Sequence, residues 1–118
     1  MFMDMVKTIK IGEEYAGEVV EEKYNPLIKR IELKIKISHI GKGTPSRGLV
    51  RKAIADAYNV DINRVYVRKI ESVFGWGVTN IEAHIYDSLE RAKLFEPKHI
   101  ITRNERATEL LQLELQQG

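Results

Sequence analysis

Apolar and polar residues alternate most regularly over residues 30–38. Ile31, Leu33, Ile35 and Ile37 are separated by single polar residues, all of them charged. A period of two puts one set of side chains in a core and the other in water, which is typical of an antiparallel sheet with one wet face. The segment therefore predicts a strand, and its exposed charges would also limit edge-to-edge aggregation.

Three other segments have strand-like patterns. Residues 18–24 come before a break at Pro26, and residues 65–73 are rich in β-branched side chains. Residues 78–86 follow a turn with two glycines and alternate apolar with polar positions. Residues 1–14 stay open, because they fit either a short strand or an ordered arm.

The residues after Gly43 predict a helix. Thr44 is suited to the N-cap and Pro45 to the first helical position, where its missing N–H has no intrahelical partner to lose. Apolar residues then recur at helical spacing as far as Tyr58, and Asn59 is suited to the C-cap. The basic residues of this helix are expected on its outer face, away from the apolar stripe.

Two further helical segments are predicted. Asp87 or Ser88 would cap a short helix over residues 89–95, which ends before Pro97. Residues 105–117 have a helical composition, and their leucines could dock on the domain or on a partner.

Taken in order, these elements predict an α+β fold in a single domain, which suits a chain of 118 residues. A right-handed crossover through the central helix would set the second and third strands parallel and leave a gap that the fourth strand fills. We expect a four-stranded, mostly antiparallel sheet in the order 1-2-4-3, with a crossover helix, a short second helix and a C-terminal helical tail. The predicted divisions are an N-terminal arm at residues 1–14, a core domain at residues 15–104 and the tail at residues 105–118.

Composition narrows the class of protein. Hydrophobic residues make up 43% of the chain, which is enough for a core, and cysteine is absent. The absence of cysteine excludes disulfides and thiolate metal sites and suits a reducing compartment. No basic-then-apolar leader opens the sequence, and no apolar run approaches the ~20 residues of a membrane span. We expect a soluble, cytoplasmic protein without membrane contact.

The net charge of +2 hides an uneven distribution. Residues 1–26 carry 3 cations and 6 acids, residues 27–70 carry 11 and 3, and residues 71–118 carry 5 and 8. A basic middle between acidic flanks predicts an anionic partner such as nucleic acid. The alternative is that these cations only solvate one face of the sheet.

Residues 41–47 form a candidate phosphate cradle, because two glycines lead into the start of a helix. The spacing fits neither a P-loop nor a dinucleotide motif, since Ser46 stands where the latter needs glycine. His39, His84 and His99 lie far apart in the sequence, and no nucleophile lies beside a base. We therefore predict no catalytic residue, no metal, no cofactor and no small-molecule substrate.

The turn at residues 74–77 carries Phe74 and Trp76 between glycines. An aromatic side chain there could stack on a nucleic-acid base, or it could fold back over the end of the sheet. The sequence leaves both readings open, and the aromatic run of the common RNA-recognition domains is absent.

Five short motifs follow one another along the chain: Asn25-Pro26-Leu27-Ile28-Lys29-Arg30, Gly41-Lys42-Gly43-Thr44-Pro45-Ser46-Arg47, Phe74-Gly75-Trp76-Gly77, Tyr86-Asp87-Ser88-Leu89 and Glu96-Pro97-Lys98-His99. In order and spacing, they resemble the small-subunit ribosomal protein twenty-four family of archaea and eukaryotes. The similarity covers residues 17–104, and the short chain without a Lys-rich tail resembles the archaeal form. Trp76 departs from the family pattern, which often has a small or basic residue there.

The resemblance implies a structural constituent of the small ribosomal subunit that binds small-subunit ribosomal RNA beside other ribosomal proteins, with no catalysis and no cofactor. The alternative is a protein–protein interaction module that uses the C-terminal helix. A basic surface would contact phosphates and carry little base information, and its clusters need not share one face. The candidate RNA-binding residues are Lys29, Arg30, Lys34, Lys36, Lys42, Arg47, Arg51, Lys52, Arg64, Arg68, Lys69, Lys98, His99 and Arg103.

Overall fold

The computed structural model describes residues 7–12, 15–38, 43–73 and 77–117, and side chains as far as residue 113. These residues form one α+β domain. In chain order its elements are β1 (Lys7–Ile11), β2 (Tyr15–Asn25), β3 (Arg30–Ser38), α1 (Arg47–Tyr58), the 3-10 turn η1 (Ile62–Arg64), β4 (Val65–Val73), β5 (Val78–Tyr86), α2 (Leu89–Phe95) and α3 (Lys98–Gln117).

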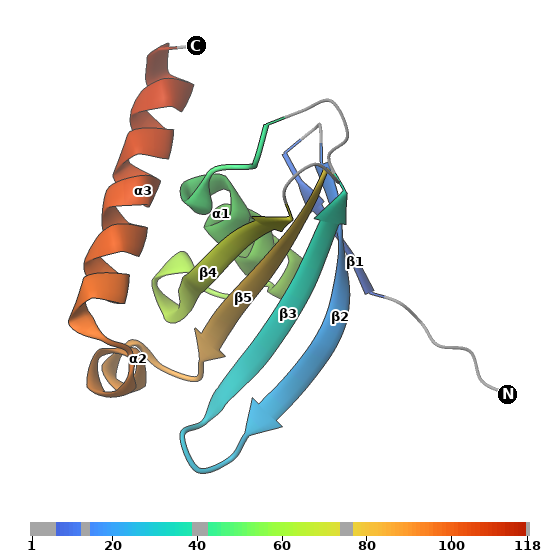
Figure 1. Ribbon diagram of the computed structural model, residues 1–118. Helices are drawn as coiled ribbons and strands as arrows, with labels where there is room; N and C mark the ends of the chain where they lie inside the picture. The colour runs from blue at the N-terminus through green and yellow to red at the C-terminus, as the bar shows by residue number, and fades with distance from the viewer. Residues whose placement is uncertain (1–6, 13–14, 39–42, 74–76, 118) are drawn as a thin grey trace, which may run out of the picture.

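All strands join one antiparallel sheet in the order β1-β2-β3-β5-β4 (Figure 1). The predicted four-stranded sheet in the order 1-2-4-3 is therefore wrong in its strand count, because β1 adds a fifth strand beside β2. Ile9 and Ile11 of β1 are buried against the core, with 1% and 0% of their surface exposed. Of the two alternatives for residues 1–14, the short strand is thus the one observed, and it forms one edge of the sheet.

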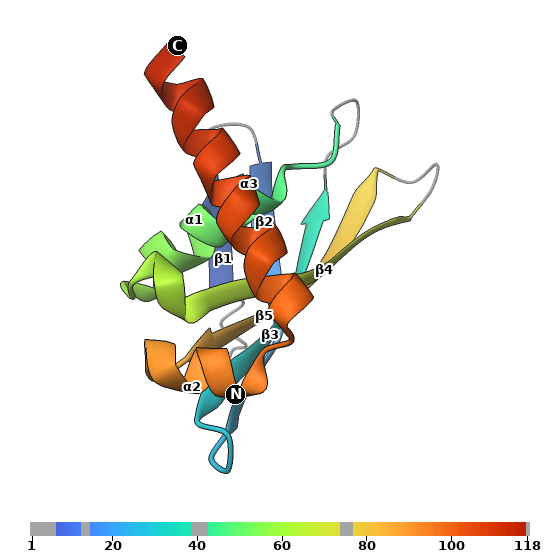
Figure 2. The same cartoon turned by 90° about the vertical axis from the view of Figure 1, so that its left-hand side faces the viewer.

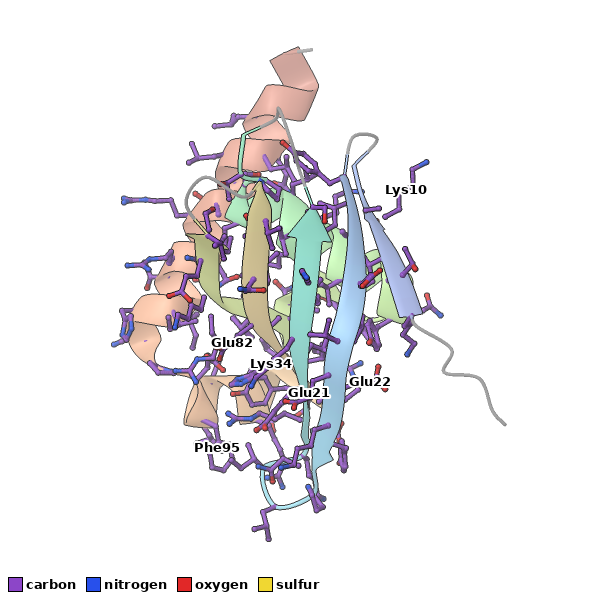
Figure 3. The ribbon with its side chains drawn as sticks, turned by 45° about the vertical axis from the view of Figure 1, so that its right-hand side comes forward. Lys10, Glu21, Glu22, Lys34, Glu82 and Phe95 are labelled. Atoms are coloured by element: carbon purple, nitrogen blue, oxygen red, sulfur yellow. The ribbon has the colours of Figure 1, made fainter. Side chains whose placement is uncertain are left out.

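The two faces of the sheet are covered unequally. One face carries the main core, in which the alternating isoleucines of β3 pack with α1. The opposite face has a smaller core at one end only, where Tyr66 and Tyr86 pack under Ala92 of α2 and Ile100 of α3. The rest of that second face, across β2, β3 and β5, is open (Figure 3).

The helix caps follow local hydrogen-bonding chemistry. The N-cap of α1 is Ser46, whose Oγ accepts a hydrogen bond from the Leu49 N–H at 3.2 Å, so the predicted cap at Thr44 is wrong. The predicted C-cap is confirmed, because Asn59 has the left-handed conformation with φ 52° and ψ 51°. Ser88 is the residue that caps α2, and its Oγ accepts from the Arg91 N–H.

Helix α3 starts at Lys98, so it begins before the predicted residue 105 and includes the predicted domain boundary at 104/105. The division into arm, core and tail stays a prediction. Figure 2 shows α3 crossing in front of α1, and the two helices meet at Gly48 and Ala107. Of the helices in the described residues, none combines the length and apolar character that crossing a membrane requires.

Candidate nucleic-acid interface

The cations of β3 on the open sheet face lie among acids from neighbouring strands. Lys34 is opposite Glu21 of β2 and Glu82 of β5, and its Nζ forms an ion pair with Glu21 at 3.7 Å (Figure 3). Lys36 is opposite Glu18 of β2. These acidic neighbours offset the positive charge of the lysines. The β3 cations that were predicted to bind RNA therefore lie on a surface of mixed charge and not on a basic one.

The cations at the start of β3 are placed by local structure. Lys29 is exposed and has a left-handed backbone with φ 59°, which closes the turn before the strand. The Arg30 side chain is only 15% exposed: its Nε donates to Glu32 at 2.9 Å and its Nη1 to the Tyr86 hydroxyl at 2.9 Å. Arg30 therefore has a structural role in this fold.

The cations of α1 do not share one outer face, and the expectation that Arg51 faces solvent is wrong. Arg51 is 1% exposed, with its Nε donating to the Val65 carbonyl at 2.7 Å and its Nη1 to the Thr108 hydroxyl at 2.9 Å. Burial accordingly lowers the pKa of Arg51. Lys52 is exposed and pairs with Asp56 one turn later at 3.3 Å, while Lys42 lies outside the described residues.

Arg47 is half-buried between α1 and the edge of the sheet. Its Nη1 donates to the Val67 carbonyl of β4 at 2.6 Å. Burial lowers the pKa of Arg47, and the positive charge of Arg103 on α3 lowers it further. The two guanidinium groups thus bring positive charge to the junction of α1, β4 and α3.

The cations around β4 are largely paired within the protein. Arg64 donates its Nε–H to the Tyr86 carbonyl at 2.7 Å, and Lys69 pairs with Glu71 at 3.5 Å. Arg68 forms an ion pair at 3.0 Å with Glu96, whose side chain is fully buried. These three residues were predicted to bind RNA. Arg64 and Arg68 contact other elements of the fold, whereas Lys69 forms an exposed ion pair within β4.

Glu96 anchors the junction between α2 and α3 on the sheet. Besides the ion pair with Arg68, its carboxylate accepts hydrogen bonds from the Tyr86 hydroxyl and from His84 Nδ1, the latter at 3.1 Å. Burial alone would raise the pKa of Glu96, but the hydrogen bonds from His84 and Tyr86, together with electrostatic attraction to His84 and Arg68, outweigh burial and lower it. The junction therefore holds a buried carboxylate, and α3 begins directly beyond it.

A side-chain clamp then fixes α3 along the edge strand β4. Asn104 accepts from the Val67 N–H at 2.9 Å and donates to the Val67 carbonyl at 2.9 Å and the Ile100 carbonyl at 2.8 Å. The amide thus satisfies the outward backbone groups of an edge residue. Sequence reasoning missed Asn104, because nothing in the sequence shows which backbone groups an edge strand leaves unpaired.

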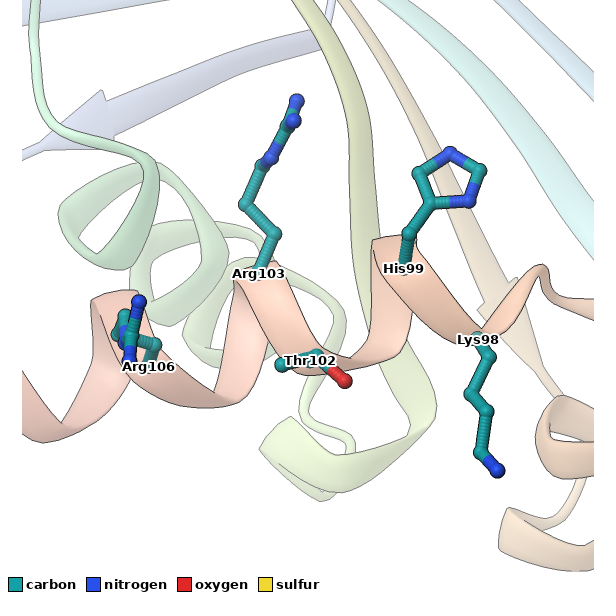
Figure 4. Close-up of a pocket in the computed structure, with 5 residues that line it drawn as sticks. All are labelled: Lys98, His99, Thr102, Arg103 and Arg106. Carbon is teal, nitrogen blue, oxygen red and sulfur yellow. The ribbon is translucent and has the colours of Figure 1, made fainter.

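Four basic residues lie along the fixed helix beside one hollow, and we call Lys98, His99, Arg103 and Arg106 the α3 basic stripe. With Thr102 they line a hollow of about 450 Å³, and His99 and Arg103 project to the same side of the helix (Figure 4). Among the residues that the structure describes, no acidic one lines this hollow. Within the described part of the chain, none of the four forms an ion pair.

Three residues of the stripe were predicted, and Arg106 was missed. His99, Arg103 and Arg106 have the spacing i, i+4, i+7, which places them on one helix face. That spacing was visible in the sequence, but it indicates a common face only if residues 99–106 belong to one helix, which requires the helix to start at Lys98. Starting the helix at residue 105 separated Arg106 from its neighbours on that face.

Over residues 15–105 the chain matches the family described as ribosomal protein S24e. It is 38% identical over 102 residues to the small ribosomal subunit protein eS24 of Saccharolobus islandicus, covering 86% of this chain and 85% of that protein. It is 35% identical over 105 residues to the small ribosomal subunit protein eS24 of Metallosphaera sedula, covering 89% of this chain and 93% of that protein. These names describe ribosomal proteins, which agrees with the prediction that the chain is not an enzyme.

Proposed function

Because the chain belongs to the ribosomal protein S24e family, we propose that it is a structural constituent of the small ribosomal subunit in the cytoplasm and binds small-subunit ribosomal RNA. Its role in translation is to help hold the folded RNA beside neighbouring ribosomal proteins. The names of the relatives support the place in the small subunit. The RNA contact is argued from the side chains of this chain.

The observation that carries the RNA contact is the α3 basic stripe. Its cations have no acidic partner in the described residues, whereas most other predicted cations are paired or buried. At a rise of about 1.5 Å per residue, His99 and Arg106 lie about 10 Å apart along the helix. Unpaired basic side chains over such a length suit successive or facing phosphates of an RNA backbone.

The fixed position of α3 strengthens this proposal. The clamp at Asn104 and the anchor at Glu96 fix the helix on both sides of the first residues of the stripe. Side chains presented from a fixed helix lose little backbone freedom on binding, which favours affinity. Arg47 adds charge beside Arg103, and the exposed Lys29 and Lys52 are proposed as secondary contacts.

A direct test measures the affinity for small-subunit ribosomal RNA against salt concentration. The variant Arg103→Gln/Arg106→Gln should bind more weakly, and its log–log salt slope should fall by about 1.4 to 1.8 if two phosphate contacts are lost. The matched control is Lys34→Gln/Lys36→Gln, which removes two cations from the mixed open face of the sheet. Equal affinity loss in the two variants, with both folded, would show that α3 has no special role.

The second candidate function is a protein–protein contact through the far half of α3. Leu110 and Leu113 are 56% and 53% exposed and lie three residues apart, so they share a face of the helix. They would suit an apolar patch on a neighbouring ribosomal protein. Sedimentation after nuclease treatment separates the candidates, because an RNA-held protein is released and a protein-held one stays with its partner.

A further inference from the structure

The buried guanidinium of Arg51 lies beside a second hollow along α3, which is lined by two acidic residues. The lining residues are Arg51, Asn63, Glu105, Thr108 and Glu109, and the hollow has a volume of about 330 Å³. We call it the acidic hollow. The acidic hollow shares no lining residue with the hollow of the basic stripe. Viewed along the axis of a helix with 3.6 residues per turn, Glu105 and Arg103 are about 160° apart.

The guanidinium in this hollow is incompletely satisfied. Two of its nitrogens donate to the Val65 carbonyl and the Thr108 hydroxyl, as described above. The third, Nη2, is buried and has no hydrogen-bond partner among the described residues. A buried donor without an acceptor costs about 1–3 kcal/mol, so an incoming acceptor would stabilise it.

The other groups of the hollow select the charge of a ligand. Glu105 and Glu109 are exposed, and they outnumber the single guanidinium. A phosphate or carboxylate would meet their repulsion, whereas a lysine or arginine side chain would be attracted. A metal ion is a poor candidate, since the described residues contain no group of three or more histidine, aspartate or glutamate side chains that could hold one.

We propose that the acidic hollow binds an extended, lysine- or arginine-bearing peptide segment of a neighbouring protein. The cationic side chain pairs with the exposed carboxylates of Glu105 and Glu109. A backbone carbonyl of the segment then accepts the hydrogen bond from Arg51 Nη2. A peptide carries both the cation and the carbonyl, whereas a polyamine lacks the carbonyl and RNA lacks the cation.

The test titrates the full-length protein with three probes and follows the NMR signals of Asn63 and Thr108. The first probe is the capped peptide acetyl-Gly-Lys-Gly-Lys-Gly-amide, the second is its glutamate counterpart, and the third is 1,5-diaminopentane, which has the charge of the first but no carbonyl. We expect the lysine peptide to shift both signals saturably. We expect weaker binding of the diamine and no binding of the glutamate peptide.

Variants locate the binding. The double variant Glu105→Gln/Glu109→Gln should lower the affinity for the lysine peptide about five-fold, as expected for the loss of two exposed charges. Glu71→Gln/Glu82→Gln removes two carboxylates from the open sheet face and should leave the affinity unchanged.

Four results would overturn the proposal. They are no saturable shift with the lysine peptide, equal affinity for the diamine, a shift of the same signals by the glutamate peptide, and equal weakening of lysine-peptide binding in both double variants. The peptide-binding proposal does not depend on the RNA contact. Even if the Arg103→Gln/Arg106→Gln variant lost its affinity for ribosomal RNA, the titration with the lysine peptide should give the same result.

Discussion

Gly48 permits the close approach of α1 and α3, and replacing it with alanine tests how tightly the two helices pack. A Cβ at this position would lie 2.5 Å from the Ala107 carbonyl oxygen, 3.0 Å from the Ala107 carbonyl carbon and 3.3 Å from the Leu111 Cβ. The nearest of these atoms belong to the backbone of α3, which cannot move aside as the end of a side chain can.

Two opposing effects decide whether Gly48→Ala raises or lowers the free energy of unfolding. In an isolated helix, alanine is favoured over glycine by about 1 kcal/mol, so the substitution would stabilise α1. The contact at 2.5 Å, however, is about 0.9 Å short of the 3.4 Å at which ordinary van der Waals contact begins, so α3 must shift. Overpacking of this kind typically costs 1–3 kcal/mol, and the shift also stretches the Asn104 clamp. Weakening of the clamp costs about 1 kcal/mol, which offsets the helix-propensity gain of about 1 kcal/mol, so we expect Gly48→Ala to lower the free energy of unfolding by about 1–3 kcal/mol net.

Urea unfolding followed by circular dichroism gives the free energy of unfolding, and thermal unfolding should show a fall of about 4 °C per kcal/mol. The matched control is Gly43→Ala, because a Cβ at Gly43 meets nothing within 4 Å. The control should stay within about 0.5 kcal/mol of the parent protein. If Gly48→Ala is as stable as the parent protein or more stable, the helices are not in close contact and the reasoning fails.

Two further predictions concern the groups that hold α3. Asn104→Ala should lower the free energy of unfolding by about 2–3 kcal/mol, because the buried Val67 N–H loses its acceptor; a loss below 0.5 kcal/mol in urea unfolding would contradict the clamp. The folded-state pKa of Glu96 is lowered, so its stabilising contribution is complete above the unfolded-state pKa of about 4.3 and is lost as the pH falls through the folded-state pKa. The stability difference between the parent protein and Glu96→Gln should therefore be large near pH 7 and shrink below about pH 4; a difference that is the same at both pH values would refute the role of the ionised carboxylate.

The sequence predicted those elements whose signals are local. The alternation in β3, the C-cap at Asn59 and the short helix α2 all follow from residues close together in the chain. Strand β1 was harder to predict, because five residues with two buried isoleucines carry little periodicity until a partner strand fixes their register. The N-cap of α1 was misplaced by two residues because Thr44 and Ser46 are both good caps and only the fold chooses between them.

The candidate site was less predictable, because it depends on contacts between distant residues. Arg51 has the helical spacing of an exposed cation, but the Val65 carbonyl and the Thr108 hydroxyl draw it inward. Lys34 looks available in the sequence, and only the strand register shows that Glu21 and Glu82 flank it. The α3 basic stripe became visible once the helix was seen to start at Lys98.

The clamp on β4 has a consequence for the order in which the chain folds. The outward carbonyls of Val65 and Val67 are covered by Arg51, Arg47 and Asn104, and the last of these belongs to α3. During synthesis α3 leaves the translating ribosome after α1 and the whole sheet, so a nascent chain passes through a stage in which the Val67 N–H lacks the Asn104 acceptor and is open to pairing with another strand. Docking of α3 ends that stage, so the helix protects the edge of β4 from pairing with a strand of another chain.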